Sequence, residues 1–397
     1  MNEEIIRVIL TSGKDHSLHR FHPWVFSGAI KKFTGEVKEG DIVEVYSAQN
    51  EFLGMGHYQI GSIAVRMFSF KQVVPDYEFW KSKIRDAYNF RTQLNLTDNA
   101  ATNCYRLCFG EGDGLPGFII DYYNGTAVLQ SHSIGLHLIK NEFVRALQEI
   151  YGDKLNAVYD KSEETMPKQA PIKATNGYLW KRENAAIENI ALENNNKFFV
   201  DWEGGQKTGF FLDQRENREL LGKYSENKVV LNTFCYTGGF SVYAAKGGAT
   251  EVHSTDISKK AIDLTDKNIE LNEIKNHTSF AVDTFDFLKH RENTYDIIVL
   301  DPPAFAKHQN VKHNAIMGYK RLNYEAIKQI KPGGFLFTFS CSQVVDNNTF
   351  NSTVMAAAIE AGRNVRILHH LSQPPDHCVS IFHPEGEYLK GLVVQVE

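Results

Sequence analysis

The chain has 397 residues, a formal net charge of −5, 42% hydrophobic residues and 23% charged residues. This length allows two or three domains, and the composition is that of an ordinary globular protein. No apolar run is long enough to span a bilayer, and the start, MNEEIIRVIL, lacks a basic segment before an apolar one. We therefore expect a cytoplasmic protein without a membrane partner.

Residues 1–73 contain short strands punctuated by glycine. The segment GDIVEVYSAQNEFLGMGHYQIGSIAVRMF alternates apolar and polar positions, with turns near Gln49–Asn50 and Ile60–Gly61. This alternation predicts a small β-barrel. In HPWVFSGAI, just before it, we interpret Trp24 and Phe26 as core residues rather than ligand-stacking ones.

Residues 74–190 mix the two periodicities. PDYEFWKSKIRDAYNFRTQL and IGLHLIKNEFVRALQEIYG have helical spacing. Between them, CYRLCFGEGDGLPGFIIDYYNGTAVLQSH predicts strands with a loop at GEGDG and a tight turn at YNGT, and NAVYDKS predicts one more strand. This order indicates a compact α+β domain.

Residues 191–397 alternate strands with helices. The candidate strands are VVLNTF, EVHSTDI, TSFAVD, YDIIVLD and GFLFTFS, separated by helical segments such as FSVYAAKGG and KKAIDLTDKNIELN. This order predicts a parallel sheet with helices on both faces. The final stretch, CVSIFHPEGEYLKGLVVQVE, predicts two further strands joined by a loop at 384–387.

Polar residues stand where these strands end, and in such a sheet ligands bind outside the carboxyl ends. Gly238 and Gly239 permit a tight turn after the first strand and close approach of a ligand. Asp256 ends the second strand, where a carboxylate can accept hydrogen bonds from two ribose hydroxyls. Asp283 ends the third and could reach an adenine edge, and Asp301 ends the fourth. Taken singly, an Asp in this position is more often a helix cap.

Together, these residues indicate a nucleoside cofactor without pyrophosphate, because the full G-x-G-x-x-G fingerprint is missing. S-adenosylmethionine has no phosphates and suits them better than NAD. Upstream, Asp213 is expected to cap the next helix, and the loop GGQKTGFF either closes over the methionine end or only connects domains. The expected cofactor-binding residues are Phe210, Asp213, Asn232, Tyr236, Thr237, Gly238, Asp256, Asp283 and Asp301.

At this point the motifs resemble a known family. QKTGFFLDQRENR, VLNTFCYTGGFSV, DPPAFAK and FTFSCS, with HPWVFSGAI and EGEYLKG, are similar to the bacterial 23S ribosomal RNA large-subunit methyltransferases of the PUA-domain type, which make 5-methylcytosine. The resemblance covers nearly the whole chain. It implies an α/β protein: a PUA-like β-barrel, a central α+β domain and a Rossmann-like class I methyltransferase domain that uses S-adenosylmethionine.

A cysteine at the end of the fifth strand suits that chemistry. Carbon 5 of cytosine is a poor nucleophile until a thiolate adds at carbon 6, which is covalent catalysis by an activated nucleophile. We interpret Cys341 as this nucleophile, since its strand is expected beside the one that ends at Asp301. A buried structural cysteine is the ordinary alternative. Asp301 would act on the cytosine amino group or on the protonated ring nitrogen.

The remaining candidates concern the RNA. The target base must leave its stack; Pro302 would stiffen the pocket loop, and Phe305 could stack on the flipped base. Lys307 belongs to a basic stretch between Pro302 and Pro332 that could follow phosphates, or could simply be a solvated helical face. Lys161 could bring positive charge from the central domain.

Other classes remain open. A purine methyltransferase, acting for example on guanine nitrogen 7, would not need the thiol. A noncatalytic RNA-binding or ribosome-assembly protein would not bind S-adenosylmethionine. RNA, most simply 23S ribosomal RNA, is the expected partner, and a homodimer is a further alternative. We expect no bound metal, because Cys104 and Cys108 have no second Cys or His pair nearby, and an odd count of 5 cysteines argues against a disulfide framework.

Overall fold

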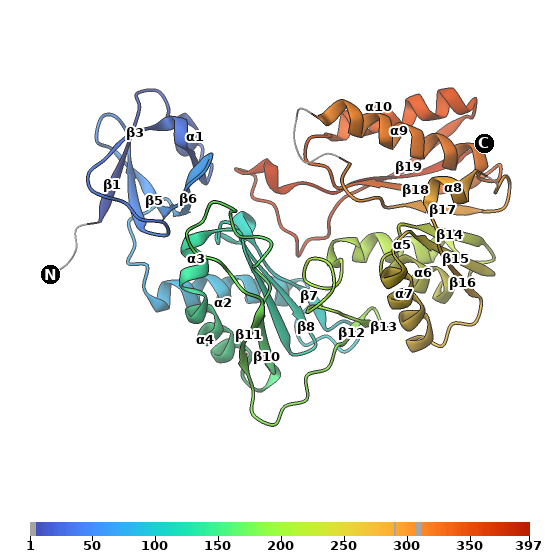
Figure 1. Ribbon diagram of the computed structural model, residues 1–397, viewed down its shortest axis with the longest axis horizontal. Helices are drawn as coiled ribbons and strands as arrows, with labels where there is room; N and C mark the ends of the chain where they lie inside the picture. The colour runs from blue at the N-terminus through green and yellow to red at the C-terminus, as the bar shows by residue number, and fades with distance from the viewer. Residues whose placement is uncertain (1–4, 290, 306–310) are drawn as a thin grey trace. The chain divides into compact units, whose positions relative to one another are not determined.

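The computed structural model describes residues 5–289, 291–305 and 311–397, which form two compact units (Figure 1). The first comprises Met1–Ala191, Val200–Leu212 and Pro375–Gly386, and the second comprises Leu192–Phe199, Asp213–Pro374 and Glu387–Glu397. The chain thus passes between the units several times. The expected domain ranges 1–73, 74–190 and 191–397 stay predictions.

The N-terminal part of the first unit is a six-stranded mixed sheet in the order β2-β6-β5-β4-β1-β3. Its strands and its short helix are β1 (Ile6–Leu10), α1 (His16–His19), β2 (Trp24–Phe26), β3 (Ile30–Phe33), β4 (Ile42–Tyr46), β5 (Phe52–Tyr58) and β6 (Ile63–Ser69). Alternating side chains such as Val43, Val45 and Val65 are fully buried, as the barrel prediction requires. One core assignment is wrong: Phe26 is 46% exposed because it faces outward at the end of the edge strand β2.

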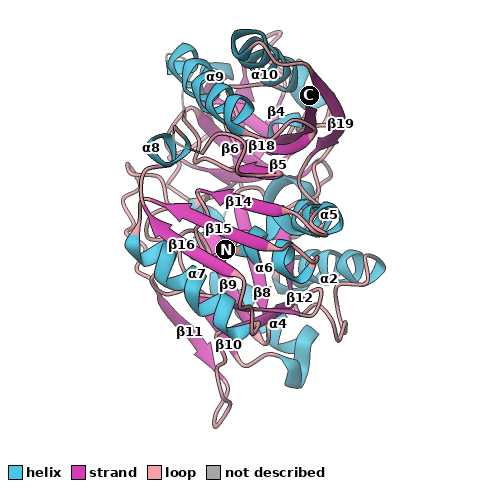
Figure 2. Ribbon diagram, turned by 90° about the vertical axis from the view of Figure 1, so that its right-hand side faces the viewer, coloured by secondary structure: helices cyan, strands magenta, loops and turns pink. Residues whose placement is uncertain are grey.

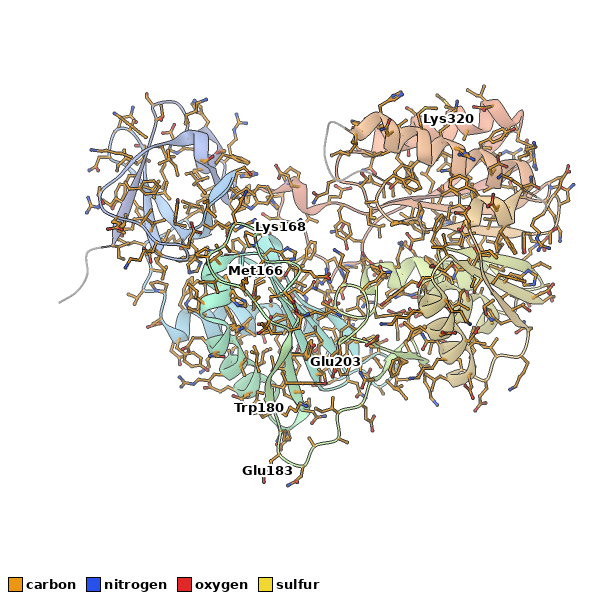
Figure 3. The ribbon with its side chains drawn as sticks, in the orientation of Figure 1. Met166, Lys168, Trp180, Glu183, Glu203 and Lys320 are labelled. Carbon is orange, nitrogen blue, oxygen red and sulfur yellow. The ribbon has the colours of Figure 1, made fainter. Side chains whose placement is uncertain are left out.

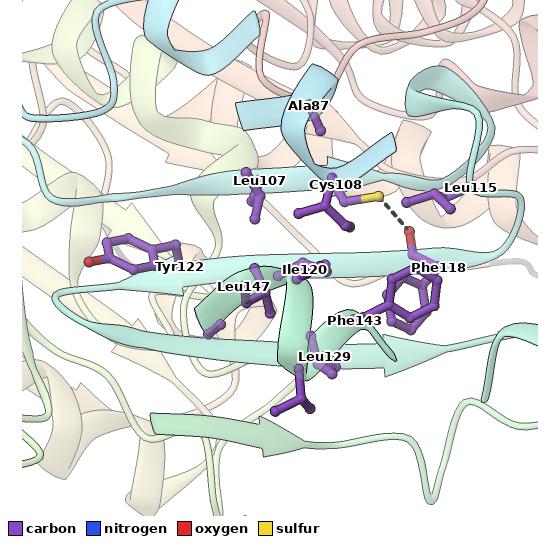
Figure 4. Packing of buried hydrophobic residues seen from close by; sticks show 14 of the residues in the cluster. Ala87, Leu107, Cys108, Leu115, Phe118, Ile120, Tyr122, Leu129, Phe143 and Leu147 are labelled. Atoms are coloured by element: carbon purple, nitrogen blue, oxygen red, sulfur yellow. Dashed lines mark hydrogen bonds between the residues drawn. The ribbon is translucent and has the colours of Figure 1, made fainter. Parts of the chain in front are cut away.

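The rest of the first unit is built on a five-stranded sheet in the order β11-β10-β9-β8-β7, with helices packed on it. The elements are α2 (Tyr77–Gln93), β7 (Cys104–Phe109), β8 (Phe118–Tyr123), β9 (Thr126–Ser131), α3 (Ile134–Leu138), α4 (Lys140–Tyr151), β10 (Ala157–Asp160) and β11 (Gly177–Lys181). Figure 4 shows its core, where Phe143 of α4 packs on Phe118 of β8 with ring centroids 4.6 Å apart. The Cys108 thiol donates to the carbonyl oxygen of Phe118 at 3.4 Å, so this cysteine is a packing residue.

Of two local predictions in this region, the tight turn is confirmed and the single helix is wrong. Asn124 and Gly125 both have positive φ, 43° and 92°, which is the two-residue turn that the YNGT motif predicts. The single helix expected over IGLHLIKNEFVRALQEIYG is instead two helices, α3 and α4, separated at Ile139. Gly135 of α3 lies so close to His57 of β5 that a Cβ there would be 2.2 Å from the ring, so packing against the N-terminal sheet sets the position of α3.

The second unit is a doubly wound sheet of seven strands in the order β16-β15-β14-β17-β18-β20-β19. Figure 2 shows β14, β15 and β16 side by side, as their parallel pairing requires. The strands are β14 (Val229–Thr233), β15 (Glu251–Asp256), β16 (His277–Ala281), β17 (Ile297–Leu300), β18 (Gly334–Ser340), β19 (Val365–Leu371) and β20 (Lys390–Val396); a separate pair is β12 (Ile190–Glu193) and β13 (Asn196–Phe199). The five parallel strands were all predicted from the sequence.

Side chains alternate along each strand, so the two faces of the sheet pack into two separate hydrophobic cores. Val230, Ile297 and Phe337 pack with α5 (Arg215–Tyr224) and α6 (Gly239–Lys246). Leu231, Ile298 and Leu336 pack with helices of the other face, which are α8 (Thr284–Leu288), α9 (Lys312–Gln329) and α10 (Asn347–Ala361). Helix α7 (Lys259–Leu271) lies against β15, β16 and α6. This two-sided burial confirms the expected Rossmann-like arrangement.

The prediction for the end of the chain is partly wrong. Of the two strands expected after residue 377, only β20 forms, and it pairs antiparallel with β18 and with β19, which the sequence analysis missed. The segment around CVSIF is irregular, with Ile381 88% exposed. It belongs to the first unit, where the buried Arg91 of α2 donates to the carbonyl oxygen of Asp376 at 2.6 Å and to Asp113 at 2.8 Å. No helix in the described part of the chain is long and apolar enough to cross a membrane.

Candidate active site

Two neighbouring strands bring a thiol and a carboxyl group to the same edge of the sheet. Strands β17 and β18 are parallel, with Leu300 opposite Thr338. Asp301 directly follows β17 and Cys341 directly follows β18, and both are half-buried. The predicted adjacency of these two strand ends is therefore present in the structure.

Burial and like charges shift both groups toward their neutral forms. The pKa of Asp301 is raised to about 7, first by burial and then by the charge of Asp213, while a hydrogen bond from Gln214 to its Oδ2, at 3.1 Å, opposes the rise. The pKa of Cys341 is raised to about 11 by burial and then by Asp301 and Asp213. The site at neutral pH thus holds a protonated thiol beside a carboxyl group that is near its own titration midpoint.

A buried lysine, which the sequence analysis did not single out, supplies the opposing charge. The Nζ atom of Lys390, in β20, donates to the carbonyl oxygens of Ser342 at 2.9 Å and of Tyr388 at 2.7 Å. Its positive charge lowers the pKa of Cys341, although the effect is smaller than those of burial and the acids. Only 5% of Lys390 is exposed, and burial lowers its pKa. A lysine at the start of the mostly apolar strand KGLVVQV was the signal that could have revealed it.

The loop after β17 is partly outside the described residues. Pro302 is buried and Phe305 is half-buried, with its ring 4.7 Å from that of Tyr319 in α9. Phe305 therefore already has an aromatic neighbour, and its stacking on a flipped base stays a prediction. Lys307 lies outside the described residues.

Three residues of the turn after β14 have left-handed backbone conformations. Phe234, Tyr236 and Gly238 have φ values of 52°, 42° and 76°. The amide of Tyr236 donates to Asp256 Oδ2 at 3.2 Å, which joins this turn to the end of β15. At Gly238 a Cβ would come 2.7 Å from Cγ2 of Thr265, so the packing of Thr265 by itself favours glycine at this position. The neighbouring Thr237 is buried, and its carbonyl oxygen accepts from Asn268 at 2.7 Å.

Two buried oxygens near the strand ends lack hydrogen-bond partners among the described residues. One is Oδ1 of Asn232, whose Nδ2 donates to Ser241 at 2.8 Å. The other is Oδ1 of Asp213, whose Oδ2 accepts from the Tyr388 hydroxyl at 2.5 Å. Because buried acceptors are normally satisfied, both oxygens fit a bound ligand with donor groups.

Asp213 and Asp283 were both candidates for helix caps, and of the two only Asp283 caps a helix. The N-cap prediction for Asp213 is wrong: α5 begins at Arg215, because a short 3₁₀ turn over Leu212–Gln214 precedes it. Asp283 does cap a helix, since its Oδ1 accepts from the amides of Phe285 and Asp286. Its contact with adenine stays a prediction.

Two exposed apolar side chains at the same edge were not predicted. Ile257 follows β15 and is 75% exposed, and Val282 follows β16 and is 38% exposed. Because β15 and β16 are adjacent and parallel, these side chains stand at neighbouring strand ends. They provide an apolar surface next to Asp256, suited to the flat face of a base.

Two further candidates lie in the first unit. Lys161 donates from Nζ to the carbonyl oxygen of Gly205 at 2.7 Å. Phe210 is buried, and its carbonyl oxygen accepts from the Tyr123 hydroxyl at 3.2 Å. The roles of Lys161 and Phe210 beside RNA and cofactor stay predictions.

Three described lysines of the basic stretch are paired with acids. Lys320 of α9, labelled in Figure 3, is 2.6 Å from Glu360, and Lys312 is 3.5 Å from Asp346. Beyond the helix, Lys331 is 3.0 Å from Asp296. These pairs reduce the charge available for phosphates and favour the solvated-face alternative for these three lysines.

Comparison with known proteins decides the family. A PUA-like domain model matches residues 8–70, and an S-adenosylmethionine-dependent methyltransferase model matches residues 176–381. The ribosomal RNA large subunit methyltransferase I of Aeromonas hydrophila is 39% identical over 397 residues, covering 98% of each chain. The chain belongs to the ribosomal RNA large subunit methyltransferase I family. The relative from Pseudoalteromonas translucida is also 39% identical, over 98% of this chain and 99% of its own.

Solved structures agree with this family. One from Streptococcus mutans, described as that of a SAM-dependent methyltransferase, has a TM-score of 0.83 at 24% identity, over 98% of this chain and 100% of its own, and supports the fold. A second, described as a methyltransferase complexed with SAH, has a TM-score of 0.83 at 25% identity with the same coverage. This member of the family is therefore an S-adenosylmethionine-dependent methyltransferase, and the expected fold class and cofactor are confirmed.

The residues at the strand ends fit this cofactor. Four carboxyl groups lie near the carboxyl ends of the strands, where their negative charge would repel phosphates. They belong to Asp213, Asp256, Asp283 and Asp301. S-adenosylmethionine carries a sulfonium and an ammonium cation, and its ammonium can donate to the unpartnered oxygens of Asn232 or Asp213.

Proposed function

We propose that the chain methylates carbon 5 of a cytosine in 23S ribosomal RNA through a covalent adduct with Cys341. The observation that carries the proposal is the thiol of Cys341 at the end of β18, beside a carboxyl group with a pKa of about 7 at the end of β17. The relatives' name supports ribosomal RNA as the substrate, and the PUA-like domain is consistent with RNA recognition.

The thiol overcomes the low reactivity of the pyrimidine. As sulfur bonds to carbon 6, the C5=C6 π electrons move toward C4 and nitrogen 3 takes a proton, which leaves an enamine with a nucleophilic carbon 5. When bound, the cofactor would supply an electrophilic methyl group to carbon 5, and the electron pair of the broken sulfur–methyl bond would stay on its sulfur. Removal of the carbon 5 proton by a base then re-forms the C5=C6 bond, expels the thiolate and returns the proton from nitrogen 3. The net change is one C–H replaced by one C–CH₃, with release of one proton.

Asp301 is suited to carry the proton between these groups. Its pKa of about 7 lets it accept the thiol proton and donate it to nitrogen 3 near neutral pH, where an ordinary aspartate is almost fully ionised. Lys390 is a positioning residue in this scheme. Its ammonium, held by two backbone carbonyls, lowers the pKa of Cys341 and so favours the thiolate.

The remaining site residues are assigned to the cofactor or to the RNA. We assign the cofactor to residues of the second unit, which are Asp213, Asn232, Tyr236, Thr237, Gly238, Asp256, Asp283 and Asp301, with Ile257 and Val282 added for the base. Phe210, in the first unit, stays a predicted cofactor residue. Lys161, Pro302 and Phe305 are assigned to the RNA. A homodimer stays a prediction.

The deciding experiment combines a variant with a trapped intermediate. Cys341→Ala should abolish methyl transfer to 23S ribosomal RNA transcripts and should fail to form a denaturant-resistant adduct with 5-fluorocytosine RNA, while retaining S-adenosylmethionine binding by calorimetry. Cys378→Ala is the matched control, because Cys378 is the other half-buried cysteine.

Full methyl transfer by Cys341→Ala would reject the covalent mechanism and favour a purine target. Mass spectrometry of the methylated RNA identifies the base. Absence of S-adenosylmethionine binding by the wild-type chain would instead contradict the assigned cofactor pocket.

A further inference from the structure

Three side chains with metal-ligating atoms meet in the first unit, away from the strand ends discussed above. His22 lies between α1 and β2, whereas His383 and Glu385 lie at the 3₁₀ turn Pro384–Gly386. In Figure 1 the red stretch drawn next to the blue strand β6 is this C-terminal segment. His22 and Glu385 are 363 positions apart in the chain, so the contact joins the N-terminal sheet to the returning C-terminal segment.

The distances among the ligating atoms are close to those of a metal site. Nε2 of His22 is 3.3 Å from both carboxylate oxygens of Glu385, and Nε2 of His383 is 3.7 Å from Oε2. All three ligand atoms lie within 4.8 Å of one another. Two ligands bound tetrahedrally to Zn²⁺ at about 2.05 Å would be about 3.3 Å apart, so small side-chain movements would complete the site.

The Nε2 atom of His383 is independent evidence for a bound ligand. His383 is only 4% exposed, yet its Nε2 has no hydrogen-bond partner in the parts of the chain that the structure describes. The contact with Glu385, at 3.7 Å, is too long to be a hydrogen bond. A buried, unpartnered imidazole nitrogen that faces a carboxylate and a second imidazole is the arrangement that a metal ion would satisfy.

The surroundings hold His383 in place and limit the ligand set to three. The ring of Trp24 packs on that of His383 with centroids 4.4 Å apart, and Trp24 Nε1 donates to Glu111 at 2.7 Å. Glu111 also accepts from Arg66 at 3.0 Å, so its charge is neutralised and it is not placed as a fourth ligand.

We propose that His22, His383 and Glu385 form a binding site for a divalent transition-metal ion, best matched by Zn²⁺. Two imidazoles and one carboxylate suit Zn²⁺, whereas Mg²⁺ and Ca²⁺ prefer oxygen ligands alone. Three protein ligands leave one position for water, and the half-exposed Glu385 gives access from solvent. The site acts as a clip between the N-terminal sheet and the segment 375–386, independently of methyl transfer.

The proposed ligation also changes one local hydrogen bond. Nδ1 of His22 accepts from the amide of Trp24 at 3.3 Å, which is long for such a bond. Coordination through Nε2 moves the ring proton to Nδ1, so this contact is lost when the metal binds. The ¹⁵N signals of the ring therefore report ligation at His22 directly.

The test uses the full-length chain, stripped with a chelator and titrated with Zn²⁺ by calorimetry, with metal content measured by mass spectrometry. We expect one Zn²⁺ per chain, not displaced by excess Mg²⁺. His22→Ala, His383→Ala and Glu385→Gln should each weaken the affinity by at least about tenfold. His370→Ala is the control, because this exposed histidine lies outside the cluster.

Folding is checked separately from binding. Glu385→Gln changes a partly exposed side chain and should fold normally by circular dichroism, and Zn²⁺ should raise the unfolding temperature of the wild-type chain but not of this variant. Failure of the wild-type chain to bind one equivalent of Zn²⁺, or equal affinity in Glu385→Gln and the wild type, would overturn the proposal.

Discussion

Asp301 binds a proton more tightly in the folded chain than in the unfolded one, because burial and the charge of Asp213 raise its pKa from 3.8 to about 7. Between these values the folded chain keeps a proton that the unfolded chain has lost, so its contribution to the free energy of unfolding falls as pH rises. Asp301→Asn should therefore be more stable than wild type, by a margin that grows from about pH 4 to 7 and then levels off. Unfolding temperatures of the cofactor-free chain across this range test this, and a margin independent of pH would contradict it.

The reactivity of Cys341 should report the charges around it. Since Asp301 raises and Lys390 lowers the pKa of Cys341, Asp301→Asn should speed alkylation of this thiol at mildly alkaline pH, and Lys390→Met should slow it. We expect changes of about threefold to tenfold, the effect of a shift of up to one pKa unit. Iodoacetamide labelling followed by peptide mass spectrometry measures the rate at each cysteine, with the half-buried Cys378 as the internal control. Equal rates in all three proteins would show that these charges do not act on the thiol.

Site residues could be predicted where their places follow from the order of the strands, and were missed where they depend on contacts between distant parts of the chain. Cys341 and Asp301 were found because each directly follows a strand, and the order of the strands predicts their adjacency. Gln214 and Lys390 were missed because their contacts join distant parts of the chain. Lys390 reaches Ser342 only because β20 pairs with β18 in the register that sets Ser340 opposite Lys390.

At the scale of elements, a buried ion pair fixes α5 against β12. Arg218 is 2% exposed and Glu193 is not exposed, and they form two parallel hydrogen bonds of 2.9 and 2.7 Å. Glu193→Gln should lower the free energy of unfolding by about 3–5 kcal/mol, because it leaves the guanidinium buried without a countercharge. Urea unfolding followed by tryptophan fluorescence measures the change.

The matched control is an exposed pair on α7. Lys259 and Asp263 are 2.7 Å apart, and both side chains are largely in solvent, so Asp263→Asn should leave the urea midpoint unchanged. If both variants lost equal stability, burial would not explain the strength of the Arg218–Glu193 pair.

The strands that were predicted wrongly show what periodicity cannot resolve. Strands β14, β17 and β18 were found because burial on both faces makes them largely apolar runs. Strand β19 lies at the sheet edge, and Arg366, Ile367 and Leu368 are all exposed, so it lacks that signal. The segment CVSIF has strand-like composition, but Ile381 remains exposed because the segment crosses to the first unit instead of pairing.

At the scale of the whole molecule, charge predicts how the proposed RNA binding responds to salt. The net charge is −5, and Lys312, Lys320 and Lys331 are already paired with acids. We therefore expect few phosphates to be neutralised: the slope of log affinity against log salt should be shallower than about −3, since each phosphate contributes about −0.9 on a duplex and −0.7 on a single strand. Filter binding of the full-length chain to a 23S ribosomal RNA fragment over a series of salt concentrations measures the slope. Lys320→Ala should leave it unchanged, because its ammonium is bound to Glu360. A slope near −6 would mean that a basic surface forms on binding, and loss of one unit of slope in Lys320→Ala would place α9 on the RNA.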